Sequence, residues 1–196
     1  QHMLEDSAKQ LDIDVVAFYE NPRKKISRQI WMASAPDAND NLRARVFDRL
    51  DPQFVERQIR DVAGYTGVID FVDHHQAHAA SSYYYSGFSD AAVMTIDGVG
   101  EWATTTYGCG DAASLEIIEE VHFPHSIGLL YSAVTSYLGF EVNEGEYKVM
   151  GLAPYGTPKY VDRFAELVRS GENGQYRLGL EFFDVLDLER MYTPRF

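Results

Sequence analysis

The sequence predicts an α/β fold built around a mixed sheet, and three observations lead to this class. Two short apolar runs, residues 12–19 and 67–72, have the length and composition of buried strands, with a polar helical stretch between them. Three more strands follow within residues 91–121, joined by short connections that carry glycine, a pattern typical of antiparallel hairpins. Helical segments follow from residue 126 onward. This order of strand, helix, strand, hairpin and helices indicates an α/β arrangement.

Prolines and a glycine divide the first half of the chain. The first strand stops at Asn21-Pro22, because proline lacks the N–H that a regular strand uses. The helical stretch that follows carries Pro36 and Pro52, which we expect to break it. A later run rich in alanine, serine and tyrosine reads as a helix that Gly87 ends. The expected elements are a strand at 12–19, helices within 23–60, a strand at 67–72 and a helix at 77–85.

In the second half, Ser126 is a suitable N-cap, and an apolar stripe with helical spacing follows it until Gly139. Residues 144–153 read as a short helix closed by Pro154-Tyr155-Gly156, and the tail from Gly171 has little periodicity. The expected elements are strands at 91–96, 102–107 and 115–121, then helices at 126–138, 144–153 and 160–170.

Composition narrows the class of function. The chain has 196 residues, a net charge of −13 and one cysteine, Cys109. An acidic surface repels phosphate backbones, so we expect neither nucleic acid nor a membrane surface as a partner. No apolar run approaches the ~20 residues that span a bilayer. With a single cysteine and no signal peptide, we expect a cytoplasmic location.

The first three residues, Gln1-His2-Met3, have the character of a cloning scar and are left out of the fold prediction. On that interpretation, Leu4 follows a cut made inside a longer protein.

Two histidines, His74 and His78, form the first candidate site. Residues four apart project from the same face of a helix, so the two imidazoles can bind one ion. Imidazole is a ligand for zinc, iron, nickel and copper. An HxxxH pair alone also fits surface or capping histidines. We expect His75 to point elsewhere and to pack or form a hydrogen bond.

The run Asp97-Gly98-Val99-Gly100-Glu101 stands at the end of a strand and is the second candidate. Asp97 offers a carboxylate for a metal, and glycines let a phosphate approach the backbone N–H groups closely. A plain hairpin turn explains the same residues equally well. Together with His74 and His78, however, Asp97 would complete a three-ligand site with open positions, which is the catalytic type.

The third candidate is the segment from Asn143 to Gly156, where charged residues stand beside glycines at both ends of an apolar run. Glu146 and Lys148 could contact a ligand, as could Glu101 and His75. A helix with a charged first turn explains most of this pattern without a ligand.

Four motifs, in this order and spacing, resemble the carbamoyltransferase family of nodulation protein U and the antibiotic O-carbamoyltransferases. They are HHQAHAASSYY, TIDGVGEWATTTYG, FPHSIGLLYSAVTSYLGF and EGEYKVMGLAPYG. The resemblance covers about residues 12–165 and implies an amino-terminal domain similar to the threonylcarbamoyl-transferase ATPase, of the actin/Hsp70-like (ribonuclease H-like) class. On this basis residues 4–170 would be part of the first actin-like half-domain, and 171–196 a tail that leads to the remainder.

The resemblance also implies ligands. His74, His78 and Asp97 would hold a divalent metal, with Fe2+ as the first expectation and Zn2+ or Mg2+ as alternatives. Gly98 and Gly100 would line the phosphates of ATP or carbamoyl adenylate. A further metal-binding aspartate, a phosphate-facing hairpin, the second actin-like half and the YrdC-like domain have no counterpart in this sequence, so the site would be incomplete and the isolated chain inactive.

In the family, carbamoyl phosphate and ATP give carbamoyl adenylate, and a hydroxyl of a small-molecule acceptor attacks its carbonyl. Two alternatives stay open. One is a threonylcarbamoyl-transferase or hydrogenase-maturation enzyme with another acceptor, against which the HHQAH and VMGLAPYG runs argue. The other is a metal-binding module without catalytic activity. The sequence identifies neither the acceptor pocket nor a general base, for which His75 is one candidate.

Overall fold

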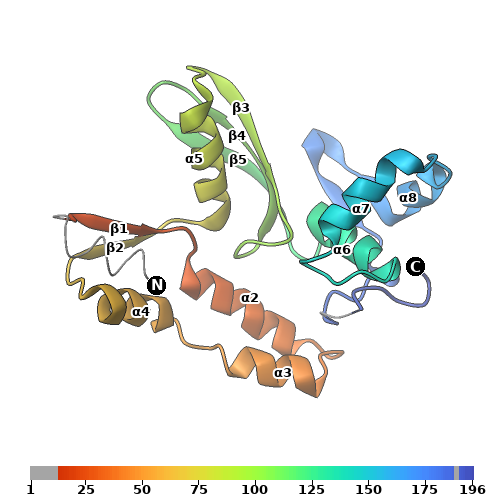
Figure 1. Ribbon diagram of the computed structural model, residues 1–196, viewed down its shortest axis with the longest axis horizontal. Helices are drawn as coiled ribbons and strands as arrows, with labels where there is room; N and C mark the ends of the chain where they lie inside the picture. The colour runs from red at the N-terminus through yellow and green to blue at the C-terminus, as the bar shows by residue number, and fades with distance from the viewer. Residues whose placement is uncertain (1–12, 188–189) are drawn as a thin grey trace.

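The computed structural model describes residues 13–187 and 190–196, so the expected cloning scar at 1–3 lies outside the described residues. The α/β class is confirmed, since helices alternate with several sheets along the chain. Figure 1 shows three groups of elements: β1 and β2 with α2–α4, then α5 with β3–β5, then α6–α8 with the carboxyl-terminal hairpin.

The first group is a parallel pair of strands, β1 (Val15–Phe18) and β2 (Val68–Phe71), joined through three helices. The expected breaks are confirmed, because helices end before Pro36 and begin again after Pro52. Asn21 and Asn39 cap the first two helices by accepting hydrogen bonds from Lys24 N and Leu42 N. The helices are α2 (Pro22–Ser34), α3 (Asp40–Phe47) and α4 (Phe54–Ala63).

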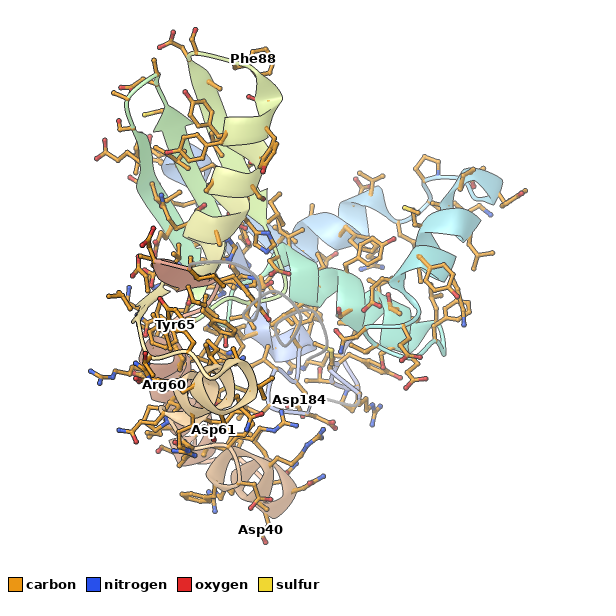
Figure 2. All side chains as sticks on the ribbon, turned by 60° about the vertical axis from the view of Figure 1, so that its left-hand side comes forward. Asp40, Arg60, Asp61, Tyr65, Phe88 and Asp184 are labelled. Carbon is orange, nitrogen blue, oxygen red and sulfur yellow. The ribbon has the colours of Figure 1, made fainter. Side chains whose placement is uncertain are left out.

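The second group packs α5 (His74–Ser86) against a three-stranded antiparallel sheet. Ala79 and Tyr83 of the helix are buried against Val93 of the sheet. Figure 2 shows Phe88 at the far end of this group, where α5 leads into the sheet. The strands are β3 (Ala91–Ile96), β4 (Ala103–Gly110) and β5 (Leu115–His122), in that order, so the predicted pairing of 91–96 with 102–107 is confirmed.

The expectation of one mixed sheet was wrong in its pairing. In the described residues the parallel strands β1 and β2 form a sheet of their own, and the antiparallel strands β3–β5 form another. Strand edges present the same backbone groups whatever their side chains, so residue patterns identify strands without showing which edges meet.

The third group begins with α6 (Ile127–Tyr137), capped by the Ser126 hydroxyl, which accepts a hydrogen bond from Leu129 N at 3.0 Å. The predicted stop at Gly139 is confirmed by its positive φ of 84°. After it come α7 (Glu146–Leu152), the 3-10 helix η1 (Ala153–Tyr155) and α8 (Val161–Leu167).

Beyond α8 the structure differs from the expected helix at 160–170 and irregular tail. Residues 168–170 form β6 (Val168–Ser170), which pairs with β7 (Tyr176–Leu178), while two short 3-10 helices lie at Glu172–Gly174 and Leu180–Phe182. The strands have three residues each, too short for a two-residue period to be recognised. Burial holds this segment in place: Leu178 of β7, with Phe183 and Met191 beyond it, shares a core with Leu130 and Ala133 of α6.

Within the described residues, no helix combines the length and apolar character needed to cross a membrane.

His125 joins β7 to the rest of the molecule and leads to a prediction about pH. Its Nδ1 accepts a hydrogen bond from Leu178 N at 3.2 Å, which requires an unprotonated nitrogen. Burial and the nearby Arg177 lower the pKa of His125 below its ordinary value. The unfolded chain therefore binds this proton more readily, so the contribution of His125 to stability is present above about pH 6.5 and is lost as pH falls below it.

We expect the thermal midpoint of the chain to fall by a few °C more than that of His125→Asn between pH 8 and pH 5, since a hydrogen bond is worth ~0.5–1.5 kcal/mol. Asparagine can retain an acceptor oxygen and does not titrate. Thermal unfolding followed by circular dichroism at several pH values measures this difference. Parallel pH profiles for the two proteins would contradict the assignment.

Candidate metal centre

His74 and His78 occupy the first two turns of α5 and face Asp97, which follows the last residue of β3. His74 Nε2 lies 2.7 Å from Asp97 Oδ2 and 3.0 Å from His78 Nε2. His78 Nε2 lies 3.5 Å from the same carboxylate oxygen. Among the described residues, His74, His78 and Asp97 form the group that could hold a metal ion. One ligand atom from each lies within 4.8 Å of the others.

The separations of these atoms fit a single ion. Bonds of ~2.0–2.2 Å to each ligand would place neighbouring ligand atoms about 3.0–3.5 Å apart. The observed 2.7, 3.0 and 3.5 Å lie close to this range, so little movement would be needed. Two imidazoles and one carboxylate form a donor set suited to Fe2+ or Zn2+, and leave further coordination positions open.

The three side chains differ in exposure, which makes the site open on one side. The His74 side chain is 16% exposed, whereas those of Asp97 and His78 are 39% and 51% exposed. A ligand could therefore approach from the side of His78 and Asp97, while His74 closes the inner side.

The electrostatics of the cluster favour a cation. Burial works to raise the pKa of Asp97, but hydrogen bonds from His74 and the Gly98 amide outweigh it, and the pKa lies below its ordinary value. The carboxylate is therefore ionised at neutral pH. His74 Nε2 lies within hydrogen-bond distance of both Asp97 and His78. A neutral imidazole carries only one ring proton for these contacts. The buried Nδ1 of His74 has no hydrogen-bond partner in the described part of the chain.

Gly100 allows α5 to approach the β3–β4 loop. A Cβ atom at this position would lie 3.0 Å from His74 Cβ and 3.0 Å from His75 Cδ2, tighter than ordinary contacts. The Gly100 amide donates to the Ala103 carbonyl at 2.9 Å, and the Gly98 amide donates to Asp97 Oδ1 at 2.6 Å. Both amides thus have partners within the loop, and phosphate binding by Gly98 and Gly100 stays a prediction.

Sequence reasoning missed Gly128 as a site residue and saw Ser126 only as a helix cap. The buried Ser126 hydroxyl also contacts the carbonyl oxygens of Asp97 and Gly98, at 3.1 and 2.6 Å. A Cβ on Gly128 would lie 2.4 Å from the Asp97 carbonyl oxygen. The start of α6 therefore lies directly against the Asp97–Gly98 peptide. The available signal in the sequence was Gly128 itself, because glycine is a poor helix former and here occupies the second position of a helix.

His75 turns away from the cluster, as the sequence predicted. It is buried, with Nδ1 2.5 Å from Thr95 Oγ1 and Nε2 2.8 Å from the Ala103 carbonyl oxygen. Burial lowers its pKa, although the bond to Ala103 opposes this. Because both ring nitrogens have partners, His75 has no free nitrogen to act as a general base in this structure.

Glu146 and Lys148 form contacts near α7 rather than near the histidines. The Glu146 carboxylate accepts hydrogen bonds from Asn143 N at 3.0 Å and Ser132 Oγ at 2.9 Å. Lys148 Nζ lies over the ring of Phe140, 6.0 Å from its centroid. These contacts fit the structural explanation of the segment, and a ligand role for either residue stays a prediction.

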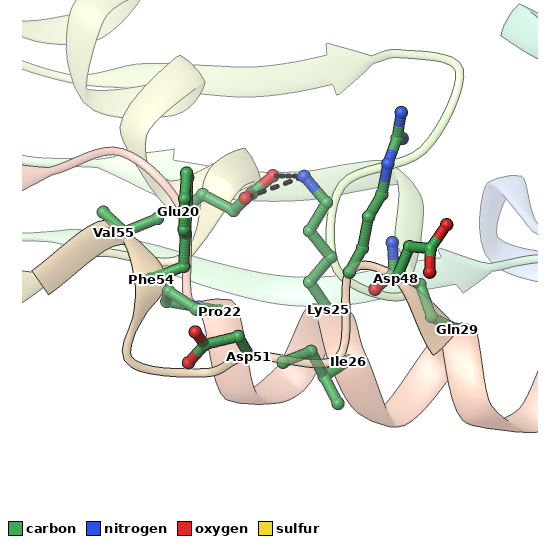
Figure 3. A pocket seen from close by; sticks show the side chains of 10 residues that line it. Glu20, Pro22, Lys25, Ile26, Gln29, Asp48, Asp51, Phe54 and Val55 are labelled. Carbon is green, nitrogen blue, oxygen red and sulfur yellow. Dashed lines mark hydrogen bonds and ion pairs between the residues drawn. The ribbon is translucent and has the colours of Figure 1, made fainter. Parts of the chain in front are cut away.

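One cavity lies beside the site, and another lies apart from it. One of about 440 Å³ lies beside α5 and is lined by His75, Glu101 and Trp102, among others. The other, of about 420 Å³, lies between α2 and the segment that leads into α4 (Figure 3). There Glu20 and Lys25 form an ion pair at 2.8 Å (Figure 3), while Asp51 of the same lining pairs with Arg57 outside it.

The fold and the cluster together define an α/β domain with a candidate two-histidine, one-aspartate metal site. Residues 6–191 match the family described as Carbamoyltransferase N-terminus, and the chain belongs to this family. It is 40% identical over 185 residues to an uncharacterized protein of Synechocystis sp., with 88% of the chain covered. It is 32% identical over 190 residues to the nodulation protein NolNO of Sinorhizobium fredii, with 92% covered.

A third relative, the nodulation protein NolO of Bradyrhizobium diazoefficiens, is 39% identical over 113 residues, or 56% of the chain. The chain spans 30%, 26% and 20% of the lengths of these three relatives.

Gly128 and Gly98 give a matched test of the packing around Asp97. We expect Gly128→Ala to destabilise the chain by about 1–3 kcal/mol, because its methyl group would overlap the Asp97 carbonyl. At Gly98 the nearest atom to an added Cβ is Leu129 Cδ2 at 3.7 Å, an ordinary contact. Gly98→Ala should therefore keep a near-native midpoint in urea unfolding. Since alanine favours helix, a stabilised Gly128→Ala protein would contradict the close packing.

Metal binding is a second prediction from the same geometry. We expect the chain to bind one equivalent of Fe2+ or Zn2+, measured by anaerobic titration calorimetry. The double variant His74→Ala, His78→Ala should bind at least ~100-fold more weakly, since only one of three ligands remains. His122→Ala is the control, because His122 forms an exposed pair with Glu120 outside the cluster. Equal binding by the double variant and the wild type would rule out this site.

Proposed function

We propose that this chain forms part of the transfer site of an O-carbamoyltransferase, which moves a carbamoyl group from carbamoyl adenylate to a hydroxyl of a small-molecule acceptor. The observation that carries the proposal is the convergence of His74, His78 and Asp97 within a chain of the Carbamoyltransferase N-terminus family. Carbamoyl phosphate and ATP would supply the adenylate elsewhere in the full-length protein, in a YrdC-like domain.

The reaction needs a mixed anhydride to be held with its carbonyl open to attack. The bond between the acceptor oxygen and the carbamoyl carbon forms, the bond from that carbon to the phosphate oxygen breaks, and AMP leaves. The acceptor hydroxyl gives its proton to a base that this chain does not identify. Negative charge develops on the carbonyl and phosphate oxygens during this exchange.

The residues of the cluster would bind the metal ion and admit the substrate for this step. His74 and His78 would provide neutral nitrogen ligands from one helix, and ionised Asp97 would balance the positive charge. When bound, a divalent metal supplies Lewis-acid polarisation of the anhydride oxygens. The exposed side of the cluster, at His78 and Asp97, would admit the substrate. Gly98, which has no side chain, would let a phosphate lie near the loop.

Asp97→Ala in the full-length protein tests the proposal. We expect carbamoyl transfer to fall by about 100-fold or more, with kcat falling further than KM rises, because Asp97 would act mainly on the transition state. Formation of carbamoyl adenylate should continue, since it would occur in another domain. Following adenylate formation and acceptor carbamoylation separately makes the first reaction the internal control. Transfer at the wild-type rate would show that this cluster has no part in the chemistry.

A further inference from the structure

Glu101 is a buried carboxylate whose contacts link three parts of the chain. It lies in the β3–β4 loop, and its residue is only 5% exposed. Its carboxylate accepts hydrogen bonds from His74 N, at 3.0 and 3.1 Å, and from Asn21 N at 2.6 Å. Its own carbonyl accepts a hydrogen bond at 2.6 Å from Nε of the buried Arg28. Burial of a carboxylate is costly without such partners, so these bonds define where the side chain must lie.

The helix that carries the two histidines has no cap from its own segment. Asp73 holds the N-cap position of α5 but forms no capping bond, and its carboxylate instead pairs with Lys24 Nζ at 2.5 Å. The first amides of a helix need partners, and a negative charge there is favoured by the helix dipole. Glu101 meets both requirements from a different loop, at the helical residue that is itself a candidate ligand.

The same loop carries Asp97, four residues before Glu101. The loop is closed by hydrogen bonds from Asp97 N to Thr104 O and from Gly100 N to Ala103 O, both at 2.9 Å. The loop therefore contributes one possible ligand, Asp97, and also binds the first residue of the helix. In this way it determines the distance between Asp97 and the two histidines. Gly100 permits this contact between loop and helix, because α5 lies too close for a side chain at that position.

We propose that Glu101 is a positioning residue for the metal site: its carboxylate, by binding the His74 amide, holds the imidazoles of His74 and His78 at the spacing that Asp97 requires. Both carboxylate oxygens accept bonds from backbone amides, which favours this role over direct contact with a ligand. The inference rests on the proposed metal function and adds a residue outside the ligand set.

The test is Glu101→Gln, which nearly keeps the shape but replaces one acceptor oxygen with an N–H₂ donor facing a backbone N–H. The matched control is Asp111→Asn at the other end of β4, where the carboxylate accepts bonds from Ala113 N and Ser114 N. Both changes remove a carboxylate that binds two backbone amides, and only the first removes a hydrogen bond to the first residue of the helix of the histidines. Co2+ serves as the metal probe, because its visible spectrum reports ligand geometry.

We expect Glu101→Gln to weaken Co2+ binding by about 10–100-fold and to change the visible spectrum, as loss of a supporting partner typically does. Asp111→Asn should match the wild type in both. In the metal-free chain, nuclear magnetic resonance should show faster exchange of the His74 amide and shifted ring nitrogens of His74 and His78 in Glu101→Gln alone.

The two readouts separate the positioning role from the metal function. Wild-type Co2+ affinity and spectrum in Glu101→Gln would overturn the positioning role while leaving the metal site in place. A wild-type chain that binds no Co2+ would refute the metal function. The ring-nitrogen shifts in the metal-free chain would then decide positioning alone: unchanged shifts in Glu101→Gln overturn it, and altered shifts support it.

Discussion

The geometry of the candidate site depends on one contact, between the first turn of α5 and the β3–β4 loop. Two of the three possible ligands come from the helix and the third from the loop, so neither element forms the site alone. The Glu101 carboxylate and the absent side chain of Gly100 bring the two together at hydrogen-bond and van der Waals distances. Burial keeps water from competing for these bonds, which strengthens them.

A second contact supports the loop at the Asp97–Gly98 peptide. The start of α6 lies against the Asp97–Gly98 peptide, where Ser126 contacts both carbonyls and Gly128 leaves room for them. The core that includes α6 also contains residues of the carboxyl-terminal hairpin, so packing far along the chain stabilises the peptide that bears Asp97. Helices α7 and η1, by contrast, bury no residue in the described chain.

The local rules of helix formation predicted most elements correctly. The serine cap at Ser126, the proline breaks and the stops at Gly87 and Gly139 all act within one turn, so the residues themselves carry the information. Errors occurred where the outcome depended on distant partners. The three-residue strands β6 and β7 are defined by pairing with each other, and the separation of β1–β2 from β3–β5 is a choice between equivalent edges.

The sequence by itself determined the ingredients of the site. A helical spacing of four places His74 and His78 on one face, and a strand followed by Asp97-Gly98 places a carboxylate at a sheet end. Only the tertiary structure decided that these groups converge, that Thr95 and Ala103 are the partners of His75, and that Glu101 binds the first amide of α5. The reason is physical: spacing along the chain orients side chains within one element. The distance between elements is set by packing and by the need of buried polar groups for partners.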